Sequence, residues 1–104
     1  MIITVSGASD PTTARSELVD PGDFRKFHVE SDANAANTVA SLVATGAGHP
    51  AEGEDVYISI AWLKTGSYAQ DEAWKSGFEG MVAFAEKSGW LSEDGLSIRA
   101  HIKE

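Results

Sequence analysis

Val56–Leu63, with the sequence VYISIAWL, is the most apolar stretch of the chain, and the predicted fold is built around it. An extended segment of this composition carries apolar side chains on both of its faces, which favours a position inside a sheet. We therefore predict a central strand over Val56–Leu63. The elements before and after it follow from their own periodicity and turn residues.

A long helix is predicted after this strand, from Gly66–Ser67 to about Ser88. Its apolar stripe repeats at helical spacing and consists of Trp74, Phe78, Met81, Val82 and Ala85. Gly77 and Gly80 lie inside this helix, where each costs about 1 kcal/mol relative to alanine. The expected reason is close approach of the helix to the sheet, and the alternative is a hinge.

Three further strands are predicted over Met1–Ser6, Phe24–Glu30 and Leu96–Lys103. Met1–Ser6 is apolar and β-branched, and the other two segments alternate between apolar and polar residues. This alternation gives Phe24–Glu30 and Leu96–Lys103 one polar face each. The residues on these faces are Lys26, His28, Glu30, Arg99, His101 and Lys103. We expect these side chains to meet on one side of the sheet.

A second helix is predicted between the strand Phe24–Glu30 and the central strand. Ser31 or Asp32 caps its start, and an apolar stripe continues to about Thr45. The glycines and the proline that follow are typical of a helix end, so Gly46–Asp55 is predicted to be a surface loop.

The long connection Gly7–Asp23 contains Asp10-Pro11, a helix-start signal, and predicts a short helix over Pro11–Val19. The order is therefore β, long connection, β, α, β, α, β. It predicts an α+β fold with a four-stranded mixed sheet. Two amphipathic helices are too few to cover both faces, so we expect both main helices on one face and an open second face.

Composition limits the class of protein. The chain has 104 residues and 11.0 kDa, which predicts a single domain over residues 1–104. There is no cysteine, which excludes disulfides and thiolate metal sites. A net charge of -8 disfavours binding to nucleic acid. No secretory signal or membrane span is recognisable, so we expect a soluble cytoplasmic protein with no membrane partner.

The candidate ligand-binding residues on the polar face are Lys26, His28, Glu30, Tyr57, Ser59, Arg99 and His101. Arginine and lysine suit an anion and an aromatic ring supplies flat contact area, which predicts a binding surface for a small anionic ligand or an acidic segment. A solvated sheet face is the simpler alternative. The catalytic alternative uses a histidine as general acid–base. His28 and Glu30 are expected to face solvent side by side without a tight hydrogen bond.

The sequence gives less support to two other kinds of site, a metal site and an anion site at the strand ends. His28, Glu30 and His101 are residue types that suit Fe(II) or Zn(II), but their spacing is not diagnostic, so we predict no metal and no cofactor. Anions also bind at the carboxyl ends of strands near helix N-termini. The residues in question are Glu30, Ser31, Asp32, Lys64, Thr65, Gly66 and Ser67. Ordinary helix capping explains most of them.

Three functions remain open from the sequence. The first is a self-associating binding or accessory module for a small anionic ligand or acidic segment. The second is a small enzyme that uses histidine and tyrosine acid–base chemistry on an anionic substrate. The third is an acidic inhibitor or antitoxin-like partner of a basic protein. We also expect a homodimer, formed through the open sheet face or an unpaired strand edge.

Overall fold

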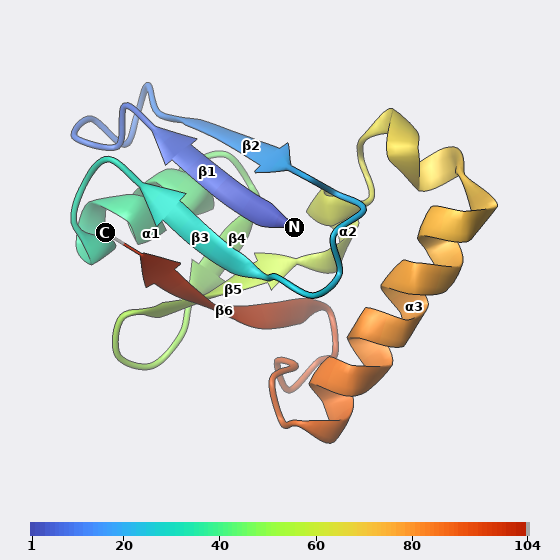
Figure 1. The fold of residues 1–104 in the computed structure, drawn as a ribbon. Helices are drawn as coiled ribbons and strands as arrows, with labels where there is room; N and C mark the ends of the chain where they lie inside the picture. Colours follow the sequence, from blue (N-terminus) through green and yellow to red (C-terminus); the bar gives the residue numbers. More distant parts are fainter. Residues whose placement is uncertain (104) are drawn as a thin grey trace.

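The computed structural model describes residues 1–103, in which strands and helices alternate irregularly (Figure 1). The strands are β1 (Ile2–Ser6), β2 (Arg15–Val19), β3 (His28–Ser31), β4 (Gly48–Pro50), β5 (Asp55–Ser59) and β6 (Ser97–Lys103). The helices are α1 (Ala35–Ala44), α2 (Ile60–Leu63) and α3 (Glu72–Lys87), with a short 3₁₀ helix η1 (Ser67–Gln70) before α3. The predicted α+β class is confirmed.

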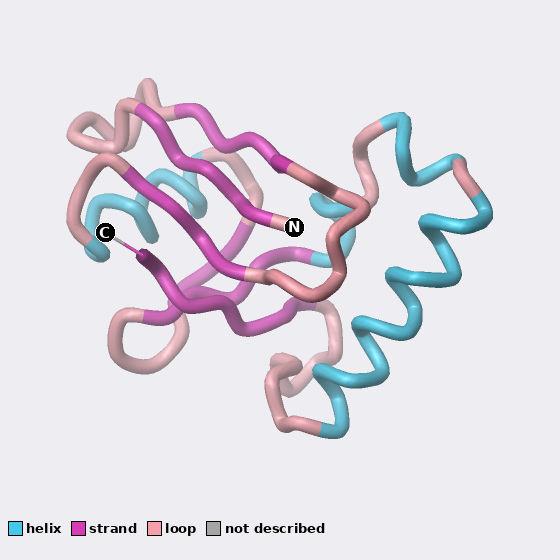
Figure 2. The backbone as a smooth tube through the Cα atoms, in the orientation of Figure 1, coloured by secondary structure: helices cyan, strands magenta, loops and turns pink. Residues whose placement is uncertain are grey.

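The six strands found within residues 1–103 form one sheet in the order β2-β1-β3-β6-β5-β4. β1, β3 and β6 are parallel to one another. β2 is antiparallel to β1, β5 to β6, and β4 to β5. The prediction of a mixed sheet is confirmed, but the prediction of four strands is wrong. The two additional strands, β2 and β4, are the edges of the sheet (Figure 2).

Both edge strands lie in segments for which other structure was predicted. In the predicted helix Pro11–Val19, the Asp10 carboxylate accepts hydrogen bonds from the backbone N–H of Thr12 (3.1 Å) and from its hydroxyl (2.6 Å). The bond from the Thr12 N–H is of the same kind as the one that caps α3 at Asp71, but only a turn follows here, because Arg15–Val19 pair with β1. The β2 residues then alternate between exposed and half-buried, which is the period of a strand. In the predicted loop Gly46–Asp55, β4 pairs with β5 as one arm of a hairpin.

The stretch Val56–Leu63 is divided between two elements. β5 ends at Ser59, whose hydroxyl accepts a hydrogen bond from the N–H of Trp62 at 3.2 Å and caps the single-turn helix α2. The fully buried side chains of the stretch come from both elements and are Val56, Ile58 and Leu63. The predicted central strand is therefore wrong in extent and in place, because β5 lies beside the edge and β3 and β6 are central.

The two long helices begin later than predicted. α1 begins after Asn34, whose side chain accepts a hydrogen bond from the backbone N–H three residues on at 2.8 Å. α3 begins after Asp71, whose carboxylate makes the equivalent bond two residues on, also at 2.8 Å. Gly66 and Ser67 belong instead to the separate turn η1. The predicted strand Leu96–Lys103 agrees with β6 to within one residue.

α1 and α3 take different positions relative to the sheet. α1 lies over one sheet face, where Leu42 joins a core that includes Ile3 and Val29. α3 stands beyond the end of the sheet at which β1 begins and β2 ends (Figure 1), and its Trp74 and Phe78 extend the same core. The prediction that both helices cover one face therefore holds for α1 alone. Within residues 1–103, none of the helices has both the length and the apolar character of a membrane-crossing segment.

The two glycines inside α3 have different surroundings. A Cβ added at Gly77 would lie 2.4 Å from the ring of Phe24, in the loop before β3. A Cβ added at Gly80 would meet nothing within 4 Å. Gly77 thus marks a close approach, as predicted, but the helix approaches that loop and not the sheet.

The substitution Gly80→Ala should raise the free energy of unfolding by about 0.5–1 kcal/mol, because alanine is the better helix former. Gly77→Ala should instead lower it by about 1–3 kcal/mol, because the added methyl group overpacks against Phe24. Urea unfolding of both variants measures the two changes. Equal effects at the two positions would show that Phe24 does not pack against α3.

Candidate functional site

One edge of β6 has two different partners along its length. At its C-terminal end, His101–Lys103 pair with His28–Glu30 of β3. Nearer its start, the Arg99 N–H donates to the carbonyl of Trp90 at 2.7 Å, and Leu91 forms a bridge with Ile98. The strand β3 therefore begins at His28, four residues later than the predicted strand Phe24–Glu30. Phe24–Phe27 belong to the loop that precedes β3, and this loop lies between β6 and α3 in space.

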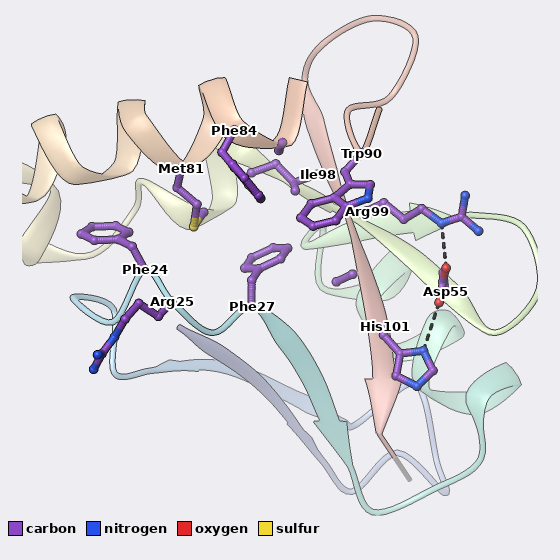
Figure 3. Close-up of a pocket in the computed structure, with 12 residues that line it drawn as sticks. Phe24, Arg25, Phe27, Asp55, Met81, Phe84, Trp90, Ile98, Arg99 and His101 are labelled. Carbon is purple, nitrogen blue, oxygen red and sulfur yellow. Dashed lines mark hydrogen bonds and ion pairs between the residues drawn. The ribbon is translucent and has the colours of Figure 1, made fainter. Parts of the chain in front are cut away.

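A cavity of about 580 Å³ lies between this loop, β6 and the C-terminal half of α3 (Figure 3). Large apolar side chains surround the open space and are Phe24, Phe27, Met81, Phe84, Trp90 and Ile98. Phe84 and Trp90 keep 60% and 46% of their surface exposed, and their rings meet edge-on with centroids 5.6 Å apart. The cavity is thus an aromatic-walled slot that opens to solvent.

Polar groups gather on one side of the cavity, around Asp55. The Asp55 carboxylate accepts a hydrogen bond from Arg99 Nε at 2.7 Å and lies 3.2 Å from His101 Nδ1. Asp55 and Arg99 are partly buried, whereas His101 is exposed. Figure 3 shows that Arg25, on the loop side, directs its guanidinium away from the cavity.

The pKa of Asp55 is lowered from its ordinary value of 3.8. Burial alone would raise the pKa, but hydrogen bonds from Arg99 and His101, together with their positive charge, outweigh it. Asp55 therefore stays ionised near neutral pH and holds both side chains in place.

His28 and Glu30 form a second pair on the open sheet face. His28 Nε2 lies 2.7 Å from Glu30 Oε2, so the prediction that these side chains make no tight hydrogen bond is wrong. The short distance arises because the two residues lie two apart on β3 and point to the same side. His101 stands opposite His28 in the sheet register, but each histidine has its own carboxylate partner. Among residues 1–103, no group of three or more His, Asp or Glu side chains is arranged to hold a metal ion.

The remaining predicted site residues lie elsewhere. Tyr57 is in register with Arg99, but its ring stacks on His49 of β4 with centroids 5.1 Å apart. Ser59 caps α2, and Lys26 is exposed in the loop before β3. Of the seven predicted ligand-binding residues, the structure brings only Arg99 and His101 to the cavity.

The alternative anion site at the strand ends does not form. β3 and β5 both neighbour β6, and one is parallel to it while the other is antiparallel. Their carboxyl ends therefore lie at opposite ends of the sheet. The Asp32 carboxylate accepts the backbone N–H groups of Gly7 (2.7 Å) and Ala8 (3.0 Å), and the Lys64 ammonium lies 5.8 Å from the ring centre of Phe78.

The apolar wall of the cavity was missed at the sequence level. Phe24 and Phe27 were assigned to a strand, and Met81 to the core stripe of the long helix. Phe84 and Trp90 carried a usable signal, because Phe84 lies off that stripe and Trp90 follows the helix end. Two large aromatic residues outside the expected core indicate a surface that binds something.

No protein-family model matches this chain, and no curated protein or solved structure shows significant similarity to it. The support for a function is therefore the geometry of the site.

The substitution Asp55→Asn should destabilise the fold by about 1 kcal/mol at neutral pH, because Arg99 and His101 lose a charged acceptor that is partly screened by solvent. A carboxyl group with a lowered folded-state pKa stabilises the fold above its unfolded-state pKa and loses this effect as the pH falls through the folded-state pKa. The difference between wild type and variant should therefore shrink below pH 3.8.

Urea unfolding at a series of pH values measures this difference. Glu54→Gln, a change of an exposed neighbouring carboxylate, serves as the control. A wild-type advantage over Asp55→Asn that stays constant through the acid range would contradict the assigned role of Asp55.

Proposed function

We propose that this chain is a binding module for a small molecule with a flat apolar body and an anionic group. The observation that carries the proposal is the exposure of Phe84 and Trp90 at the mouth of the cavity. Covering apolar surface is worth about 25 cal/mol per Å², so two half-exposed aromatic rings in a concave site favour an apolar occupant.

The size and charge of the cavity support the same class of ligand. A volume of about 580 Å³ lies within the usual range of about 300–1,000 Å³ for small-molecule sites. The polar side of the cavity carries Arg99, whose charge offsets that of Asp55, and His101, in a chain of net charge -8. Arg99 donates to Asp55 and, through Nη2 at 3.4 Å, to the Glu52 carbonyl, and retains further donors, and guanidinium groups suit carboxylates.

The Asp55–His101 pair favours a second candidate, an enzyme that acts on the bound molecule. A histidine oriented by a carboxylate at the edge of a cavity is suited to general acid–base catalysis. Tyr57 does not take part, since its ring stacks on His49. An enzyme would need His101 for turnover more than for affinity, so His101→Gln separates the two candidates. The function as an acidic inhibitor stays a prediction from charge alone.

Calorimetric titration with 3-phenylpropionate and with its neutral counterpart 3-phenylpropan-1-ol tests the proposed site. We expect the carboxylate to bind more tightly, and we expect Phe84→Ala to weaken its binding about tenfold or more. Val43→Ala is the matched control, because Val43 is also an exposed apolar residue on a helix but lies outside the cavity lining.

Arg99→Gln should remove the preference for the carboxylate while leaving the alcohol bound as before. The proposal is wrong if neither probe binds at millimolar concentration, or if Phe84→Ala and Val43→Ala bind the carboxylate equally well.

A further inference from the structure

β2 is an edge strand, and the direction of its backbone groups follows from its neighbour β1. The Asp32 N–H donates to the carbonyl of Val5 at 3.4 Å, so the backbone groups of Val5 face β3. These groups alternate in direction along a strand, so those of Thr4 face β2 and pair with Glu17, its partner in the register. The hydrogen bond from the Thr4 hydroxyl to the Glu17 carbonyl, at 3.5 Å, agrees with this direction.

The same alternation turns the backbone N–H and C=O groups of Ser16 and Leu18 outward, away from β1. Within residues 1–103, no backbone–backbone hydrogen bond outside the β1–β2 ladder involves Arg15–Val19. β2 also contains no proline, which distinguishes it from the opposite edge, where β4 is three residues long and ends at Pro50. Of the two edges, β2 is therefore the one that presents a row of open backbone groups.

We propose that the outer edge of β2 pairs antiparallel with β2 of a second copy of this chain, about a two-fold axis through Ser16. The charges on the strand select this register. With the axis at Ser16, Arg15 of each copy stands opposite Glu17 of the other, and two ion pairs form. With the axis at Glu17, two carboxylates would be directly opposed.

The geometry of the ladder strengthens these ion pairs. Ser16 would form the hydrogen-bonded pair on the axis, so Arg15 and Glu17 would occupy the adjacent pairs without backbone hydrogen bonds. Side chains in such pairs approach more closely than those in hydrogen-bonded pairs. Arg15 and Glu17 are both exposed and point to the same sheet face, so they are free to meet their counterparts.

Arg15 is central to the proposal because the chain as a whole is acidic. Two copies of net charge -8 repel each other at long range, although salt at physiological strength screens charges beyond about 8 Å. Arg15 supplies the positive charge of the β2 edge and converts a local repulsion into a complementary contact.

Light scattering coupled to size-exclusion chromatography of the full chain tests the pairing. We expect a mass of twice 11.0 kDa at high micromolar concentration for the wild type. Arg15→Glu and Glu17→Arg should each give a monomer, and the double variant Arg15→Glu/Glu17→Arg should dimerise again. Glu93→Arg, the same change of charge as Glu17→Arg at an exposed turn, should leave the dimer intact.

Ser16→Pro gives an independent check. It removes the outward N–H on the axis and the 3.0 Å hydrogen bond between the Ser16 and Thr45 hydroxyls, but no hydrogen bond to β1, so it should yield a monomer whose circular dichroism matches the wild type. A wild-type chain that stays at 11.0 kDa, or a dimer that survives both single charge reversals, would overturn the proposal. Failure of the double variant to dimerise would overturn the Ser16 register. None of these changes touches the cavity lining, so the outcome is independent of the ligand site.

Discussion

The sharing of one edge of β6 between two partners is the constraint on which the candidate site depends. β3 pairs with the last three residues of that edge, and the Trp90–Leu91 segment takes the part nearer the start. Because both segments form hydrogen bonds with the same edge of β6, neither can pair with the full length of β6. The chain before β3 is displaced toward α3, and the space left between these elements is the cavity.

The displaced loop Asp20–Phe27 is held by contacts with parts of the chain far away in sequence. The indole N–H of Trp74 donates to the carbonyl of Pro21 at 2.8 Å, and the ring of Phe24 lies against the backbone of Gly77. The N-terminal ammonium group donates to the carbonyl of Asp23. Since two of these contacts come from α3, the loop and the helix support each other as opposite walls of the cavity.

Sequence patterns correctly predicted the elements in which the spacing of the apolar residues reflects burial of one face. β1, β6 and the buried face of α3 match their predictions because each buries a regular row of apolar residues. The prediction of one strand over Val56–Leu63 failed because a short apolar run is compatible both with a single strand and with a strand followed by a capped helical turn. The structure forms the helical turn, which the Ser59 hydroxyl caps by accepting a hydrogen bond from the N–H of Trp62. The sequence alone does not show this bond.

The candidate site was only partly predictable for a related reason. Strict alternation identified Arg99 and His101 correctly as outward residues of the last strand. It could not reveal that β3 begins only opposite His101, near the end of β6, since that depends on competition from Trp90–Leu91, about sixty residues later in the chain. Phe84 and Trp90 stand out in the sequence as aromatic residues outside the expected core, but their assembly with Phe24 and Phe27 into one cavity wall follows from this competition and is not visible in local patterns.

The most direct test of this account is the set of nuclear Overhauser contacts between bound 3-phenylpropionate and the protein. The account predicts contacts from the phenyl ring of the probe to the rings of both Phe27 and Trp90, on the two sides of the gap along β6. Contacts confined to one of these walls, or contacts on the open sheet face near Tyr57, would contradict it.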